Sequence, residues 1–145
     1  MKALIQRVKK ASVTIDNELY SEIEKGILVF LGVTKDDTIE NSQKLVQKVL
    51  ALRIFEDENE KMNFSISDIK GQILVVSQFT LCADCKKGTR PSFDTAAAPD
   101  IAAKLYENFV EQLKQSGLVV KTGKFRAMMD VSLINDGPVT IMVEK

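Results

Sequence analysis

Gly26-Ile27-Leu28-Val29-Phe30-Leu31-Gly32-Val33 is a continuous apolar run that is bounded by glycine. A strand that is covered on both faces has this composition, because all of its side chains, and not every second one, must be apolar. Further along the chain, the apolar run Ile73-Leu74-Val75-Val76 turns polar abruptly at Ser77. The first run therefore predicts a strand buried on both faces, and the second predicts a strand that ends where a polar segment begins.

The segments on either side of these runs show the alternating pattern of strands. Leu4 to Val8, and then Ala11, Val13 and Ile15, show the alternation of strands, and Asp16-Asn17 predicts a turn before Leu19-Tyr20. Near the other end, we expect three closing strands at Leu118 to Lys121, Phe125 to Ile134 and Val139 to Val143. In the middle one, alternate residues from Phe125 to Leu133 would share one face.

Two segments have helical spacing. Asp37 with Glu40 three residues later predicts a capped helix over about residues 38–54. Pro99 suits the first turn of a second helix, which Gly117 would stop. The order of about seven strands and two helices predicts an α/β fold, in which mixed or antiparallel sheets form a barrel-like core with the helices packed outside. We expect residues 1–145 to form a single domain.

The composition limits the classes of function. The chain has 145 residues, 45% of them apolar, with 20 basic and 20 acidic side chains. A disordered chain is excluded, and no overall field draws the protein to nucleic acid or membrane, so any RNA contact must use a local patch. The chain has neither a signal-like segment nor a run near the ~20 apolar residues that span a bilayer. We expect a cytoplasmic protein without membrane contact.

The chain contains no histidine and only two cysteines. Ser-His-Asp and Cys-His catalysis are therefore excluded, as are zinc sites with histidine ligands. Cys82 and Cys85 have C-x-x-C spacing, but no second pair completes a zinc site, and the motif follows a strand and does not open a helix. Two reduced thiols are the simpler reading, and thiol redox chemistry stays an alternative. Glycine-rich loops for nucleotide phosphates are not found.

Once these classes of site are excluded, two segments nearly sixty residues apart are the candidates for a functional site. They are Ser77-Gln78-Phe79-Thr80-Leu81 and Asn135-Asp136-Gly137-Pro138-Val139-Thr140. Glycine allows unusual backbone angles, and an X-Pro bond is cis at a cost of only about 0.5–1 kcal/mol. Gly137-Pro138 can therefore form a sharp corner in the chain, and such a corner can point two backbone carbonyls in one direction.

Together, these segments resemble the S-Q-F-T-L and N-x-G-P-x-T signatures of the D-aminoacyl-tRNA deacylases. The resemblance covers essentially the whole chain and includes the loop from Lys86 to Phe93. A sister family that acts on other misacylated tRNAs has a P-Q-A-T-like first motif, so Ser77 and Phe79 favour the D-specific branch. The resemblance implies hydrolysis of D-aminoacyl-tRNA, with glycyl-tRNA as a further substrate to test.

The resemblance assigns the first segment to the catalytic pocket. Ser77 to Thr80 would form one wall, with the Phe79 N–H as an oxyanion donor and Gln78 holding the substrate region. Thr80 is the obvious nucleophile, but no base is adjacent in sequence to activate it. An aminoacyl ester is already activated, so positioning and an oxyanion hole are enough for its hydrolysis. We therefore expect attack by water, assisted by the ribose hydroxyl of the tRNA.

The resemblance gives the second segment a role in stereochemistry. Gly137-Pro138 is implied to be cis, to reach into the active site of a second subunit and to fill the space that an L side chain needs. Arg7 is implied to brace this corner. Phe125 and Met129 are implied to line the site of the terminal adenosine. The expected unit is a homodimer with active sites at the subunit interface, which binds the 3′ end of aminoacyl-tRNA and uses no metal and no cofactor.

Each of these assignments has an ordinary structural alternative. Ser77 and Thr80 can simply end a strand, Gly137-Pro138 can be a hairpin corner, and Phe125 and Met129 can be core residues. Lys86, Lys87 and Arg90 can be solvated loop charges, although beside a pocket they can contact phosphate. A non-catalytic RNA-binding protein that uses this loop is the main rival to the enzyme.

Overall fold

The computed structural model describes all 145 residues of the chain, and the long strand β1, Lys2–Ile15, organises it. Along one edge, β1 pairs antiparallel with β8, Asp130–Glu144. Along its other edge, the first half of β1 pairs with β3, Gly26–Gly32, and the second half pairs with β2, Glu18–Ile23. The β1–β8 register shifts twice between Gln6 and Lys10, and bulges of this kind bend a strand.

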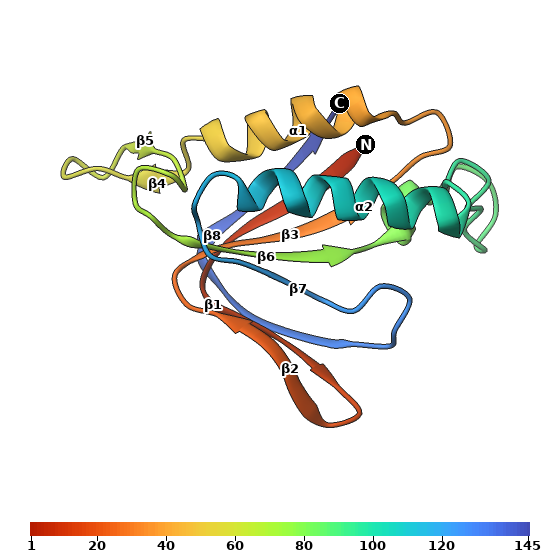
Figure 1. Cartoon of the computed structure of the whole chain (residues 1–145), viewed down its shortest axis with the longest axis horizontal. Coiled ribbons are helices and arrows are strands. Elements are labelled where there is room, and N and C mark those ends of the chain that lie inside the picture. The colour runs from red at the N-terminus through yellow and green to blue at the C-terminus, as the bar shows by residue number, and fades with distance from the viewer.

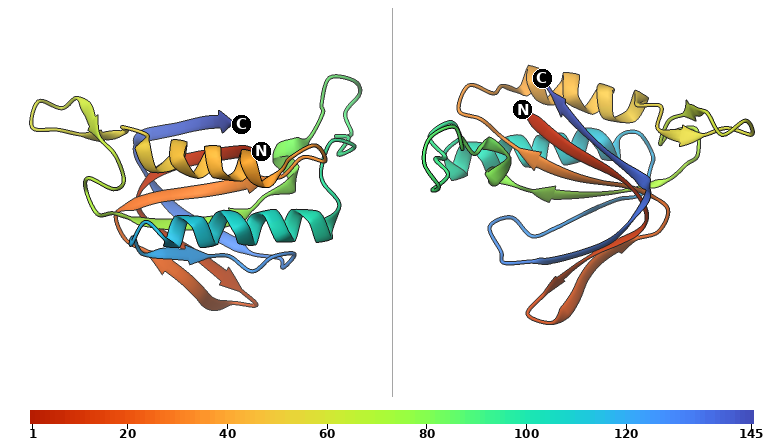
Figure 2. Two further views of the ribbon diagram at one scale, coloured as in Figure 1. Left: turned by 45° about the horizontal axis from the view of Figure 1, so that its top comes forward. Right: turned by 180° about the vertical axis from the view of Figure 1, so that it is seen from behind.

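The sheet continues from β3 through two parallel strands. β3 pairs with β6, Gln72–Ser77, and β6 pairs with β7, Val120–Thr122. The Ser21 hydroxyl of β2 donates a 2.8 Å hydrogen bond to the Thr122 carbonyl, which brings the first edge of the sheet near the last. Figures 1 and 2 show the sheet curving round in this way. The prediction of a mixed, barrel-like sheet is confirmed.

Two helices, α1 (Ile39–Ala51) and α2 (Pro99–Lys114), cover one face of this sheet (Figure 1). Side chains of β3 divide between two cores: Ile27, Val29 and Leu31 pack under the helices, and Leu28 packs inside the curve of the sheet. β3 is therefore buried on both faces, as its composition predicts. No helix is both long and apolar enough to cross a bilayer.

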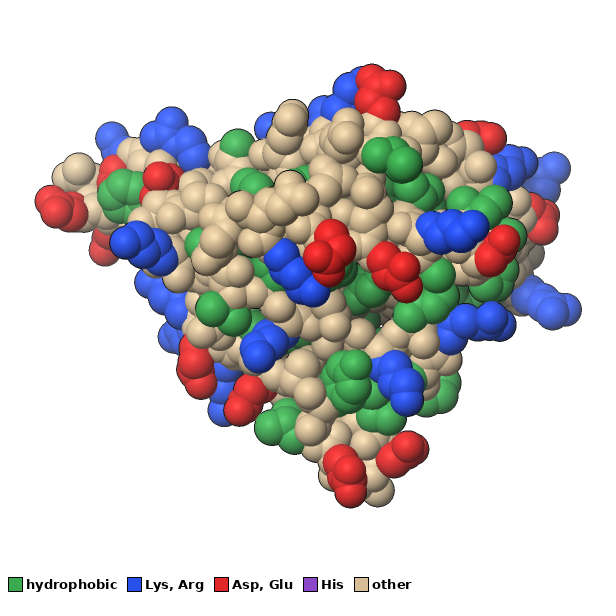
Figure 3. All heavy atoms as spheres, viewed as in Figure 1, with side chains coloured by type: hydrophobic (Ala, Val, Ile, Leu, Met, Phe, Trp, Pro, Cys, Tyr) green, Lys and Arg blue, Asp and Glu red, His purple; other side chains and the backbone are tan.

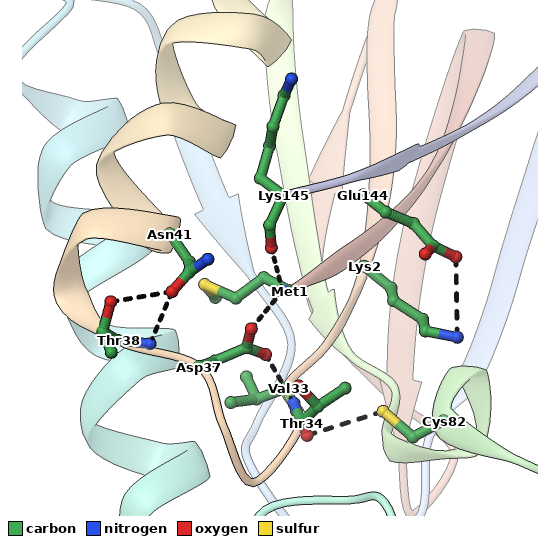
Figure 4. Close-up of polar contacts among 10 residues, drawn as sticks. All are labelled: Met1, Lys2, Val33, Thr34, Asp37, Thr38, Asn41, Cys82, Glu144 and Lys145. Carbon is green, nitrogen blue, oxygen red and sulfur yellow. Dashed lines mark hydrogen bonds and ion pairs between the residues drawn. The ribbon is translucent and has the colours of Figure 1, made fainter.

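The start of α1 differs from the prediction, because Thr38 and not Asp37 is the N-cap. The Thr38 N–H and hydroxyl both lie within hydrogen-bond distance of Asn41 Oδ1. Asp37 instead accepts hydrogen bonds from the buried α-ammonium of Met1 and, at 2.6 Å, from the Thr34 N–H (Figure 4). A buried ammonium needs an anionic partner, and this requirement takes the Asp37 carboxylate away from the helix.

The predicted strand from Phe125 to Ile134 is shorter than expected, because β8 begins only at Asp130. Its last partner on β1 is Thr14, and β1 then ends at the turn formed by Asp16 and Asn17, whose φ angles are 51° and 65°. Residues before Asp130 therefore have no strand to pair with. At its other end, β8 continues through the Gly137-Pro138 corner as far as Glu144 without dividing into two strands.

Three short elements complete the fold. The charged segment around residues 57–61 is the tip of a hairpin between β4, Phe55–Glu56, and β5, Met62–Phe64, which projects from the body (Figure 1). The 3₁₀ helix η1, Phe79–Cys82, follows β6 directly. The polar segment after β6 therefore forms a helical turn at the end of a buried strand.

Candidate active site

A cavity of about 540 Å³ opens where β6 ends. Its walls come from the ends of β3 and β6, from η1, from the amino end of α2 and from the segment 125–131. Twelve of its 16 lining residues are hydrophobic. Its volume and apolar character are those of a site for a small organic group, with a few polar atoms at the rim to orient it.

The structure brings five of the predicted site residues into this one cavity. They are Ser77, Gln78, Phe79, Phe125 and Met129. The first three come from the end of β6 and the start of η1, and the last two come from the segment that precedes β8. The two groups are nearly fifty residues apart in the sequence, but they lie close together in space because β6 and β7 are neighbours in the sheet.

Hydrogen bonds fix the wall formed by β6 and η1. The Gln78 N–H donates to the Leu31 carbonyl at 2.8 Å, and the Gln78 side-chain amide donates to the Thr80 hydroxyl oxygen. Phe79 begins η1, so its N–H lies at the amino end of a helix, where helix geometry supplies no acceptor. Phe79 is 57% exposed, and its ring packs edge-on against that of Phe93, at a centroid distance of 5.0 Å.

The opposite wall is a tight turn that rests on β6. The Gly123 N–H donates to the Val75 carbonyl at 2.9 Å, and a Cβ at Gly123 would lie only 2.7 Å from Met129 Sδ. The buried Tyr106 hydroxyl donates to the same Val75 carbonyl at 2.9 Å, and its ring lies 5.8 Å from that of Phe125. Burial raises the pKa of Tyr106 well above its usual range, so its hydroxyl stays neutral.

Sequence patterns alone missed several residues of this cavity. Ala96, Ala97 and Ala102 line it, as does Arg126. The small side chains at the start of α2 leave the space open, and the alanine run before Pro99 was the only available signal. Tyr106 and Gly123 support the wall from behind, and nothing in the sequence distinguished them from other core and loop residues.

Arg7, Gly137 and Pro138 form a second group, centred on the corner in β8. The Gly137-Pro138 peptide is cis, and Gly137 has φ +128°. Arg7 is buried, and its guanidinium donates to the carbonyl oxygens of Asp136 at 3.0 Å and Ile54 at 2.7 Å. Arg7 Nη2 also lies 3.3 Å from the Glu56 carboxylate.

The Asn135 side chain forms hydrogen bonds to the residues that follow the corner. Its side-chain oxygen accepts a hydrogen bond from the Val139 N–H, and its side-chain nitrogen donates to the Thr140 hydroxyl, both at 2.8 Å. A second amide, that of Gln6, donates to the same hydroxyl at 3.1 Å. The corner is thus bound to β1 from both sides.

The corner does not lie at the cavity of its own chain. Arg7 pairs with Ile27 of β3, which pairs with Ile73 near the start of β6, whereas the cavity opens at Ser77. Four residues of strand at about 3.3 Å each separate these levels by roughly 13 Å. None of Arg7, Gly137 and Pro138 lines the cavity. The two signature segments therefore lie at opposite ends of β3 and β6.

The basic residues Lys86, Lys87 and Arg90 lie at the tip of a loop beside the cavity. Asp84 and Ser92 close this loop with two backbone hydrogen bonds of 2.8 and 3.0 Å. All three basic side chains are exposed, and none forms an ion pair. Figure 3 shows Lys and Arg side chains on the side of the molecule where this loop projects.

The two cysteines differ in their surroundings. Cys82 is buried at the end of η1, with its Sγ 3.5 Å from the Val33 carbonyl, and burial raises the pKa of its thiol. Cys85 is exposed in the basic loop. The structure contains no group of three or more His, Cys, Asp and Glu residues arranged to hold a metal ion.

Comparisons with known proteins agree on one family. Residues 4–144 match the family described as D-Tyr-tRNA(Tyr) deacylase. A "D-aminoacyl-tRNA deacylase" of an Exiguobacterium strain is 57% identical over 145 residues, covering 100% of this chain and 99% of that protein. A protein of the same name from Thermotoga petrophila is 56% identical over 144 residues, covering 99% of this chain and 97% of that protein.

Solved structures share the whole fold. One, titled "c-Myc DNA Unwinding Element Binding Protein", has a TM-score of 0.94 and 45% identity, with 100% of this chain and 99% of that chain covered. Another, titled as a probable eukaryotic D-amino acid tRNA deacylase, has a TM-score of 0.87 at 20% identity, with 99% and 98% covered, and supports the fold alone. With the full-length sequence match, these likenesses establish that the chain belongs to the D-Tyr-tRNA(Tyr) deacylase family.

Proposed function

We propose that the chain hydrolyses the ester bond of D-aminoacyl-tRNA, releasing tRNA and the free D-amino acid. The observation that supports this most directly is the cavity at the end of β6, into which Ser77, Gln78 and Phe79 converge with Phe125 and Met129. The family and its full-length relatives provide the substrate class. In this proposal, Phe125 and Met129 receive the terminal adenosine, and the β6–η1 wall receives the ester.

Catalysis in this proposal uses the main chain and the substrate. Water attacks the ester carbonyl carbon, and the carbonyl oxygen becomes an oxyanion that the Phe79 N–H stabilises. The bond from the acyl carbon to the ribose oxygen then breaks. The proton that water loses ends on that ribose oxygen, through the neighbouring ribose hydroxyl. The Thr80 hydroxyl already accepts the Gln78 amide, and no histidine exists to activate it as a nucleophile.

We also propose that the complete site needs two copies of the chain. The Gly137-Pro138 corner and the cavity lie at opposite ends of β3 and β6, so one chain does not bring its own corner to its own substrate. In a twofold dimer the exchange is reciprocal, and each chain provides the corner for its partner's cavity.

The corner would then select the D configuration by exclusion. D and L esters differ only in the direction of the side chain at Cα, so rigid backbone carbonyls placed at that direction reject one of them. Hydrogen bonds to Arg7 and Asn135 constrain the corner on both sides of Gly137-Pro138. Glycine has no side chain to reject, so the same filter predicts cleavage of glycyl-tRNA.

The decisive experiment mixes two defective variants. Gly137→Ala alters the corner, and Ala127→Trp fills the cavity, in which Ala127 is a lining residue. In a mixed dimer, one site has both defects and the other has neither. In an equal mixture that exchanges subunits freely, about a quarter of all sites then have neither defect. The ratio of D- to L-tyrosyl-tRNA hydrolysis should therefore rise on mixing above that of Gly137→Ala alone. A ratio that stays at the Gly137→Ala value would contradict the shared site.

The rival function, RNA binding without catalysis, is separated by the same assay. A wild-type chain that binds tRNA through the basic loop but leaves D-tyrosyl-tRNA intact would support the rival. Release of D-tyrosine at an enzyme-dependent rate would exclude it.

A further inference from the structure

Arg126 is the only charged side chain among the residues that line the cavity. It is exposed, and none of the six ion pairs of the structure includes it. Residues 120–129 contain two further cations, Lys121 and Lys124, and no carboxylate. An unpaired guanidinium therefore lies beside a cavity whose other lining residues are uncharged, within a locally basic segment.

The backbone of Arg126 has an unusual conformation. The Ala127 N–H donates to the Lys124 carbonyl at 3.2 Å, which closes a turn with Arg126 at its third position. Arg126 has φ +64°, in the left-handed region that favours glycine or asparagine. Non-glycine residues in such conformations tend to occur at functional sites, where the surrounding structure maintains them.

The turn is anchored on both sides of Arg126. Phe125 is partly buried, with its ring 5.8 Å from that of Tyr106. Gly123 bonds to the Val75 carbonyl and packs against Met129. The turn thus directs Phe125 toward the core and leaves Arg126 exposed at the rim of the cavity.

We propose that Arg126 binds the phosphodiester that joins the terminal nucleoside of the tRNA to the preceding nucleotide. This inference rests on the proposed function, because a nucleoside held in the cavity places its 5′ phosphodiester at the rim. The planar guanidinium matches two phosphate oxygens at once, which a lysine cannot do. The subsite is separate from Lys86, Lys87 and Arg90, which lie beyond the η1 wall and are suited to more distant phosphates.

Two substrate mimics test this assignment. One is adenosine with a D-tyrosyl ester on its ribose, which has no phosphate, and the other is the trinucleotide C-C-A with the same ester. Arg126→Gln should lower kcat/KM for the trinucleotide about tenfold, the loss of one charge-assisted contact, and leave the adenosine ester unchanged. The loss should lie in KM. Lys121→Gln is the matched control, because Lys121 belongs to the same basic segment but does not line the cavity.

Equal losses on both mimics, or no loss on either, would overturn the assignment. The proposed function is tested separately, by deacylation of full-length D-tyrosyl-tRNA. If the wild type hydrolyses neither mimic, binding of uncharged C-C-A decides the role of Arg126. Its affinity should fall with Arg126→Gln, and the salt dependence should flatten by about 0.7 in log–log slope, the value for one single-strand phosphate.

Arg126→Gly distinguishes the effect of the backbone conformation from the effect of the charge. Glycine accepts φ +64° readily, so this variant should have a higher Tm than the wild type and still lose about tenfold on the trinucleotide. Arg126→Lys should restore only part of the affinity. Full trinucleotide activity in Arg126→Gly would show that the guanidinium has no part in binding.

Discussion

Arg7 Nε donates a hydrogen bond of 3.0 Å to the carbonyl oxygen of Asp136, which connects β1 to the residue that precedes the Gly137-Pro138 corner. The same guanidinium donates to the Ile54 carbonyl at 2.7 Å. One buried side chain therefore ties the corner both to the first strand and to the segment between α1 and β4. The proposed filter for D substrates depends on this connection, and the first two predictions test it.

Arg7→Lys should destabilise the chain and loosen the corner. A lysine has a single ammonium and cannot reach both carbonyls with the fixed geometry of a guanidinium, so a buried acceptor is left without a donor. We expect a loss of about 1.5–3 kcal/mol in the free energy of unfolding and a lower D/L activity ratio. Urea unfolding and deacylation of matched D- and L-tyrosyl-tRNA measure these effects. Lys9→Ala, at an exposed position on the same strand, is the control. Equal changes in unfolding free energy and D/L ratio in the two variants would contradict a role of Arg7 in holding the corner.

Gly137→Ala should shift the corner itself. The residue has φ +128°, and an added Cβ would lie 2.8 Å from Val139 Cγ2 and 3.0 Å from Arg7 Nη2. We expect a cost of about 1–3 kcal/mol and a rise in L activity that exceeds the loss of D activity. Gly117→Ala is a suitable control, because its φ is +79° but its Cβ would meet nothing within 4 Å. An unchanged D/L ratio in Gly137→Ala would place the filter elsewhere.

Thr80→Ala should retain most of the hydrolytic rate. The Thr80 hydroxyl accepts the Gln78 amide, and the proposed attack comes from water. Loss of a true nucleophile removes several orders of magnitude, so single-turnover deacylation distinguishes the two cases clearly. A covalent aminoacyl group trapped on Thr80 and detected by mass spectrometry would refute the water mechanism.

Replacing Lys86, Lys87 and Arg90 together by glutamine should weaken tRNA binding and flatten its dependence on salt. Each lost phosphate contact on a duplex reduces the log–log slope by about 0.9. The D/L ratio should not change, because none of these three residues lines the cavity. Substituting Lys9, Lys10 and Lys70 is the matched control for net charge. An unchanged slope in the loop variant would indicate that tRNA binds another surface.

The two thiols should react with alkylating reagents at very different rates. Alkylation needs the thiolate, and burial raises the pKa of Cys82, so this thiol stays neutral to higher pH than an exposed thiol. At pH 8 we expect rapid labelling of Cys85 and slow labelling of Cys82 in the folded chain, with both reacting in urea. Cys82→Ser and Cys85→Ser should each keep deacylase activity. Loss of activity upon oxidation, prevented by either substitution, would instead support the thiol redox alternative.

The pattern of apolar and polar residues predicted most of the strands and helices, because in these segments the local pattern agrees with the packing of the folded chain. The apolar run from Gly26 to Val33 is buried on both faces, as its uniform composition requires. The hairpin at Asp16 and Asn17 forms where two residues tolerate positive φ. Predictions failed where a distant group changed the outcome. Asp37 pairs with the Met1 ammonium and leaves the capping position to Thr38.

The sequence by itself determined which residues could do the chemistry, and the tertiary structure decided where they meet. The absence of histidine excluded a histidine base, and the two signature segments pointed to the family. The pairing of β1, β3 and β6 then places Arg7 beside the start of β3 and β6, and Ser77 lies at the end of β6. Strand register is a long-range property that no local pattern contains, so only the folded chain shows that the corner and the cavity lie apart.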